Sequence, residues 1–238
     1  MAKVSVEEFA RQVGEALQGR LVALLLYGST ARGTHVPGRS DVNTLLVCDA
    51  ADETLFALLE PAVRAWTRGG NPAPLILTEG EWRASSDAFP IEYEEMRQDH
   101  RVLAGRDPWP GIVVRREDVR RQLEYELLSK LVRLRQAYAA LWSEPKRLGA
   151  LVLGSVAGFL TMLRSVLRLS GRAAVGAPDA VVRDAAALIG FSPDAVTHIV
   201  AHARGEPGRR RGFGPHDPLL QAYLAAVART TEFVNRLT

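Results

Sequence analysis

The stretch "YGSTARGTHVPGRSDVNTLLV", residues 27–47, lies between two apolar segments of the chain. Residues 21–26 form an unbroken apolar run, and residues 42–48 form a second, mostly apolar one. Runs of this length and composition predict strands that are buried on both faces. The stretch therefore predicts a turn that carries the chain from the end of one buried strand to the start of the next.

Gly28 and Ser29 open this turn, and they are suited to binding phosphate. Glycine has no side chain, so the backbone can come close to an anion. Serine can cap the following helical turn and donate its hydroxyl, and the free N–H groups at the start of such a turn attract negative charge. A Gly-Ser pair is common by itself, so its meaning depends on the residues that come after it.

Asp41 and Asn43 come next, at the start of the second predicted strand. Side chains two residues apart in a strand point to the same face, and an acid pair there would hold two divalent cations on one triphosphate. An amide oxygen is a weaker ligand for a hard cation than a carboxylate, and it cannot bridge two metals. The sequence therefore predicts a metal position at Asp41 and Asn43 that is poorer than an acid pair.

Together, these residues resemble the motif of the nucleotidyltransferase superfamily of the DNA polymerase β type. That family carries Gly-Ser, a linker, and then Asp-x-Asp on the next strand. The match consists of Gly28, Ser29 and Asp41, supported by "ARG" at 31–33 and by "SDVNTLLV" at 40–47. The helical second half of the chain also resembles the carboxyl-terminal domain of antibiotic nucleotidyltransferases.

This resemblance implies an α+β fold, with a nucleotidyltransferase-like mixed β-sheet and helices followed by an all-α helical bundle domain. It also implies a nucleoside triphosphate and Mg²⁺ as cofactors, bound at Gly28 and Ser29 with Arg32 and Arg39 near the anion. Asp41 would hold the metal and carry any catalysis.

The sequence departs from the family pattern in two places. Asn43 replaces the second acid, and the third predicted strand, "NPAPLILT" at 71–78, contains no carboxylate where the family places its third. Glu79, Glu92 and Glu94 are the nearest acids that could substitute, and the last two would share a face if their segment were a strand.

Three functional hypotheses arise from these observations. The leading hypothesis is a nucleotidyltransferase-like protein that is catalytically impaired but keeps a nucleotide or phosphate pocket. The first alternative is an active Mg²⁺-dependent enzyme that transfers an AMP-like group to a small-molecule hydroxyl. The second alternative is an interaction protein whose pocket is vestigial.

The chain divides at the turn-forming segment "GRDPWPG", residues 105–111, into predicted domains 1–110 and 111–238. In the first part, patterning predicts helices at 5–17 and 52–68, a short helix capped by Thr78, and a third strand at 75–77. Residues 89–105 fit a strand or a helix equally well. The second part contains only predicted helices, at 117–142, 148–169, 178–189, 193–203 and 218–237, and the apolar segment 148–169 is expected at the centre of the bundle.

Composition argues against several classes of protein and partner. The net charge is +3 over 238 residues, so nucleic acid is not expected as a partner. The single cysteine, Cys48, excludes an internal disulfide. The uncharged run at 148–163 is shorter than the ~20 residues a membrane span needs, which predicts a cytoplasmic protein with no membrane partner. The oligomeric state remains open.

Overall fold

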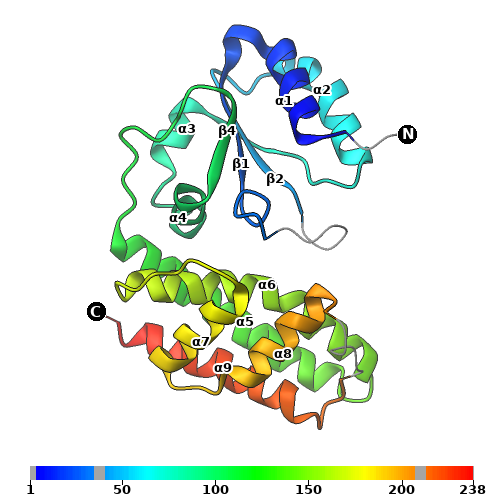
Figure 1. The fold of residues 1–238 in the computed structure, drawn as a ribbon, viewed down its shortest axis with the longest axis vertical. Helices are drawn as coiled ribbons and strands as arrows, with labels where there is room; N and C mark the ends of the chain where they lie inside the picture. The colour runs from blue at the N-terminus through cyan, green and yellow to red at the C-terminus, as the bar shows by residue number, and fades with distance from the viewer. Residues whose placement is uncertain (1–3, 35–40, 207–212, 238) are drawn as a thin grey trace. The chain divides into compact units, whose positions relative to one another are not determined.

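The computed structural model of this chain describes residues 4–34, 41–206 and 213–237. The chain forms two compact units, Met1–Val114 and Arg115–Thr238, the first with a sheet and the second helical (Figure 1). An α+β fold with a mixed sheet followed by a helical region is therefore confirmed. Whether the two parts fold independently, as domains 1–110 and 111–238, stays a prediction.

The amino-terminal unit has a four-stranded sheet in the order β3-β2-β1-β4. β1 is antiparallel to both of its neighbours, whereas β2 and β3 are parallel. The elements are α1 (Val6–Leu17), the 3-10 helix η1 (Gln18–Arg20), β1 (Leu21–Tyr27), β2 (Asn43–Cys48), α2 (Glu53–Arg68), β3 (Leu75–Thr78), α3 (Glu79–Ala84), α4 (Pro90–Gln98) and β4 (His100–Gly105).

Both faces of this sheet are covered by helices, which explains why its central strands are apolar without alternation. Figure 1 shows α1 and α2 on one side of the sheet and α3 and α4 on the other. On the first side, Phe9 of α1 stacks on Trp66 of α2, with ring centroids 4.5 Å apart. On the second side, Trp82 of α3 stacks on Tyr93 of α4 at 4.3 Å.

The ambiguous segment 89–105 contains both a helix and a strand. Residues 90–98 are helical and residues 100–105 form β4, so the strand on which Glu92 and Glu94 would share a face does not form there. The helix forms because Tyr93 and Met96 lie on one side of it and are buried against the sheet. β4 pairs with β1 at the edge of the sheet.

The segment 105–111, predicted to be the junction, packs onto the amino-terminal unit. The Arg106 N–H donates to the carbonyl of Val22 in β1, at 2.9 Å. The indole N–H of Trp82 donates to the carbonyl of Pro108, at 2.8 Å. The amino-terminal unit therefore continues to Val114.

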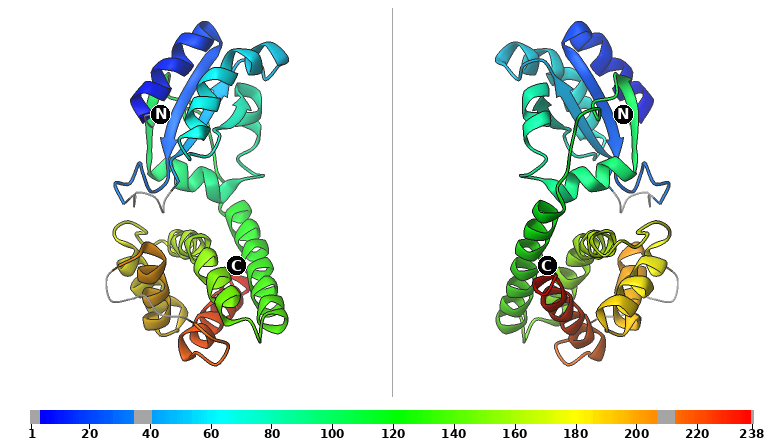
Figure 2. Two further views of the ribbon diagram at one scale, coloured as in Figure 1. Left: turned by 90° about the vertical axis from the view of Figure 1, so that its right-hand side faces the viewer. Right: turned by 90° about the vertical axis from the view of Figure 1, so that its left-hand side faces the viewer.

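The carboxyl-terminal unit contains α5 (Arg116–Ala140), α6 (Pro145–Leu169), α7 (Pro178–Ile189), α8 (Pro193–Arg204) and α9 (Pro218–Asn235) (Figure 2). The helix α6 packs against all four of the others, as its apolar sequence predicts. By length and composition α6 could cross a membrane, but half of its most apolar window is buried inside the structure. Burial of this kind is typical of the core helix of a bundle.

Candidate functional site

The predicted phosphate turn forms directly after β1. Gly28 has φ +78°, a left-handed conformation that glycine adopts without strain. The N–H of Arg32 donates to the carbonyl of Gly28 at 3.0 Å, and the N–H of Thr34 donates to the carbonyl of Ser29 at 2.9 Å. Residues 28–34 therefore form a hydrogen-bonded turn at the end of a buried strand, and this turn contains no regular helix.

Asn43 lies against Gly28, across the junction of β1 and β2. Asn43 pairs with Tyr27 in the antiparallel register, at the end of both strands. A Cβ built on Gly28 would lie 3.3 Å from Nδ2 of Asn43, so the side-chain amide faces the glycine. A glycine at position 28 therefore serves both the left-handed turn and the close approach of this amide.

Asp41 is exposed, and it comes two residues before the first residue of β2. The expected strand at 42–48 thus begins one residue later, at Asn43. The Oγ1 of Thr30 donates to the backbone carbonyl of Asp41 across 3.5 Å, which places Asp41 beside the turn. The structure therefore brings Asp41, Asn43 and Gly28 together, whereas Arg39 lies outside the described residues.

Arg32, predicted to lie near the anion, contacts two acids of the α4 region. Its Nη1 is 2.9 Å from Oε2 of Glu95 and 3.2 Å from Oδ2 of Asp99. The side chains of Arg32 and Glu95 are 16% and 10% exposed, so this ion pair is largely shielded from water. In this geometry Arg32 ties the turn to α4, and its charge is already balanced by two carboxylates.

The three acids that could supply a further carboxylate have different surroundings. Glu79 pairs with Arg106 and Arg83, and these two guanidinium groups hold the pKa of its carboxyl below the usual range. Glu94 lies 4.0 Å from Arg97 on its own helix. Glu92 is exposed on α4, and it is the acid with an electrostatic link to the site.

That link runs through Tyr27. Burial raises the pKa of the Tyr27 hydroxyl, and the negative charge of Glu92 raises it further. Tyr27 lies between Asn43 and His100 in the sheet register, so the three side chains share one face of the sheet. Glu92 therefore acts on the same end of the sheet that carries Asn43.

The donor set fits Mg²⁺ only in a limited way. Within 4–34, 41–206 and 213–237, no three or more His, Cys, Asp or Glu side chains are grouped so as to hold a metal. Magnesium is often bound by one or two carboxylates together with the phosphates of a substrate, and Asp41 offers one carboxylate beside the turn. The two acids that a two-metal site needs are not both present at positions 41 and 43.

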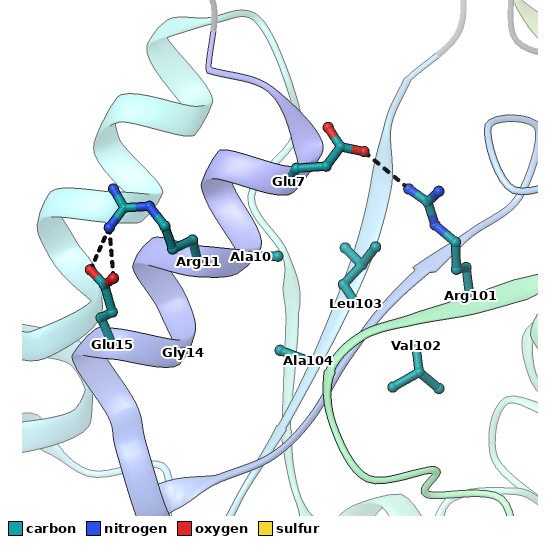
Figure 3. Close-up of a pocket in the computed structure, with 9 residues that line it drawn as sticks. All are labelled: Glu7, Ala10, Arg11, Gly14, Glu15, Arg101, Val102, Leu103 and Ala104. Carbon is teal, nitrogen blue, oxygen red and sulfur yellow. Dashed lines mark hydrogen bonds and ion pairs between the residues drawn. The ribbon is translucent and has the colours of Figure 1, made fainter.

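A separate pocket of about 600 Å³ lies between α1 and β4 (Figure 3). Apolar residues of both elements line it, and two ion pairs border it, Arg11 with Glu15 and Glu7 with Arg101. The residues predicted for the nucleotide site do not line it. These charged groups compensate one another, so the pocket shows no preference for an anion or a cation.

Sequence reasoning missed Tyr27, Glu95 and Asp99 as neighbours of the site. A signal for the two acids exists, because Glu92, Glu95 and Asp99 are spaced by three and four residues, the spacing of one helix face. Such a row of acids predicts a basic partner. The identity of that partner, Arg32, lies more than sixty residues earlier in the chain and could not be read from local patterning.

Comparison with known proteins gives a fold. No protein-family model and no curated protein sequence matches the chain. Among solved structures, spectinomycin adenyltransferase AAD(9) from Enterococcus faecialis, crystallised with ATP and spectinomycin, matches with a TM-score of 0.56. The chain has a nucleotidyltransferase-like fold. The match covers 95% of this chain and 99% of the other at 12% sequence identity, so it supports the architecture.

Proposed function

We propose that the turn 28–34 binds a nucleoside triphosphate together with one Mg²⁺, and that the protein transfers nucleotidyl groups slowly or not at all. The contact between Gly28 and the Asn43 amide carries this proposal. It is compatible with a phosphate turn, and Asn43 is a neutral side chain at the position where the family motif has its second metal-binding carboxylate. The solved neighbour was crystallised with ATP, which supports a nucleotide as the ligand.

The residues of the site have separate roles in this proposal. The backbone at Gly28 and Ser29 approaches the phosphates, and Asp41 completes the ligands of one Mg²⁺ with the phosphate oxygens. The bound ion would neutralise phosphate charge and orient the triphosphate. Arg32 holds the turn in place through Glu95 and Asp99. With one strong carboxylate, the site lacks the charge that would hold a second cation beside the first.

An active transferase is the second candidate, and the position of Glu92 is the observation that favours it. Its charge acts on Tyr27, beside Asn43, so it is the acid best placed to replace the missing carboxylate. In that case an AMP-like group would pass to a hydroxyl of a small molecule, such as an aminoglycoside antibiotic. A vestigial pocket in an interaction protein is the third candidate.

Calorimetric titration with ATP, with and without Mg²⁺, separates these candidates when it is combined with a pyrophosphate-release assay on an aminoglycoside panel that includes spectinomycin. We expect Mg²⁺-dependent binding and no turnover above background. Turnover that is lost in both Asp41→Asn and Glu92→Gln would establish the active transferase. If ATP binds under no condition, the proposed nucleotide site is wrong, and the interaction protein with a vestigial pocket is the candidate that remains.

A further inference from the structure

The helix α5 carries a row of exposed side chains that the bundle core does not use. Its buried side chains, among them Leu123, Leu127 and Leu131, face the rest of the bundle. On its other side lie six exposed residues that we call the α5 stripe: Arg121, Tyr125, Leu128, Val132, Arg135 and Ala139. Their spacing alternates between four and three residues, which is the repeat of a coiled-coil seam.

The centre of the α5 stripe is apolar. Tyr125 is 69% exposed, Leu128 49% and Val132 42%, and the three are neighbours on one helix face. Single exposed apolar residues are normal on a protein surface, whereas large contiguous apolar patches are typical of interaction sites. Figure 2 shows α6 and α9 on one side of α5 and, within the described part of this unit, no helix over the other side.

The α5 stripe is symmetric about position 130. Leu128 and Val132 lie equally far from this position along the helix, and so do Tyr125 and Arg135. The outer pair, Arg121 and Ala139, is also equidistant from it. The side chain of Lys130 leaves the stripe clear, because its Nζ points into the bundle and donates to the carbonyl of Ser155 in α6, at 3.0 Å.

This symmetry makes the stripe complementary to an antiparallel copy of itself. Leu128 would pack on Val132, and the Arg135 guanidinium would lie over the Tyr125 ring, a favourable cation–π arrangement. Glu124, next to Tyr125 and 40% exposed, forms an ion pair with Arg120 at 2.9 Å on the same helix. A parallel copy in register would instead place Arg121 on Arg121 and Arg135 on Arg135, with like charges opposed.

We propose that the α5 stripe binds the same stripe of a second copy of this chain, in antiparallel orientation with the twofold axis beside residue 130. The stripe spans eighteen residue steps, about 27 Å of helix. The interface uses helix faces of the carboxyl-terminal unit alone, so it does not depend on nucleotide binding.

Sedimentation equilibrium of the full chain tests whether a second copy of the chain binds the α5 stripe. The mass should rise from 26.0 kDa toward twice that value as protein concentration increases. Leu128→Glu should raise the dissociation constant at least tenfold, because it places a charge at the centre of an apolar contact. Leu58→Glu on α2 is the matched control, since Leu58 is 43% exposed and lies outside the stripe. A mass of 26.0 kDa at every concentration, or equal weakening by the control, overturns the proposal.

Disulfide trapping tests the orientation. The chain has one cysteine, Cys48, and it is buried, so introduced thiols can be followed separately. Full-length Tyr125→Cys/Arg135→Cys should form a covalent dimer on oxidation, because these positions face each other in the antiparallel pair. Tyr125→Cys alone should not, because its two copies lie about 15 Å apart, beyond disulfide reach. Dimers in the single variant, or none in the double variant, contradict the proposed orientation.

Discussion

Asn43 is the residue that limits how many cations the predicted site can hold. Aspartate is nearly the same size, so Asn43→Asp should fold and bring a second carboxylate beside Asp41. In chelator the variant should melt below the wild type, because two nearby carboxylates repel each other. Added Mg²⁺ or Mn²⁺ should raise its melting temperature more than that of the wild type, because a carboxylate binds hard cations better than an amide does.

The control for this experiment is Asp41→Asn, which removes the carboxylate that the wild type already has. Its melting temperature should not respond to either metal. If Asn43→Asp, Asp41→Asn and the wild type all respond equally, positions 41 and 43 do not form a cation site. Transfer activity need not appear in Asn43→Asp, since the family's third carboxylate is still missing from the strand at 71–78.

Arg32 joins the predicted phosphate turn to the α4 region through two ion pairs. Arg32→Ala leaves Glu95 and Asp99 without their shared cation in a place that is largely shielded from water. We expect it to lower the free energy of unfolding by about 1–3 kcal/mol, measured by urea denaturation.

Arg11→Ala is the matched control for Arg32→Ala. Arg11 also contacts two acids, Glu8 and Glu15, but its side chain is 56% exposed. Exposed ion pairs contribute little, so the loss should be small and close to the error of the urea measurement. Equal effects of the two substitutions would mean that the contact between Arg32 and α4 does not stabilise the turn.

At the scale of the element, β4 depends on the glycine that ends it. Gly105 has φ +80°, and a Cβ there would lie close against the carbonyl oxygen of Val22 in β1. Gly105→Ala should therefore destabilise the protein by about 3 kcal/mol or more in chemical denaturation. Gly70→Ala is the control, because Gly70 has φ +84° with open space where a Cβ would lie, and it should cost only about 1 kcal/mol.

The elements differ in how well the sequence alone predicts them, and burial explains the difference. β1 and β2 are covered on both faces, so their apolar runs have no other good interpretation. α4 has three acids among its nine residues, and these obscure the helical spacing of its buried residues Tyr93 and Met96 in the sequence. β4 is an edge strand with an exposed Arg101, so it has neither a continuous apolar run nor clean alternation.

Two tyrosines of the helical unit should lower the free energy of unfolding at alkaline pH. Burial raises the pKa of Tyr138 to about 12, with a further contribution from the charge of Asp217, and burial also raises the pKa of Tyr223. Above pH ~10 the unfolded chain loses these protons first, so the folded state binds more protons and the free energy of unfolding decreases. Tyr138→Phe and Tyr223→Phe should each reduce this decrease between about pH 10 and 12.

The same two variants differ near neutral pH, which separates titration from hydrogen bonding. The Tyr223 hydroxyl is 2.8 Å from Oγ of Ser155, and Tyr223→Phe should cost about 1 kcal/mol. Among the described residues, the buried Tyr138 hydroxyl has no hydrogen-bond partner, so Tyr138→Phe should cost nothing or stabilise slightly. Urea denaturation at several pH values measures both effects, and a Tyr138→Phe profile that falls as steeply as the wild type would refute the assignment.

For the molecule as a whole, the residues of the predicted turn could be placed from the sequence, whereas their neighbours on α4 could not. Gly28, Asp41 and Asn43 are close together because one turn connects adjacent strands, and this can be inferred from local sequence. Glu95 and Asp99, in the α4 region, come close to the turn only because the chain between β3 and β4 packs back against the sheet. Tertiary contacts of this kind are set by packing across the sheet, and the local pattern does not contain them.

The two compact units each have their own buried core, so each should fold without the other. In the amino-terminal unit, helices cover both faces of the sheet, and the segment after Gly105 is fixed by the bond from Trp82 to Pro108. In the carboxyl-terminal unit, four helices pack against α6. Fragments 1–114 and 115–238 should therefore each unfold in one cooperative transition when followed by circular dichroism. A fragment that ends at residue 104 should not unfold cooperatively, because it lacks Gly105 and the segment whose Pro108 carbonyl is bound by Trp82. Failure of either full unit to melt cooperatively would mean that the two cores depend on each other.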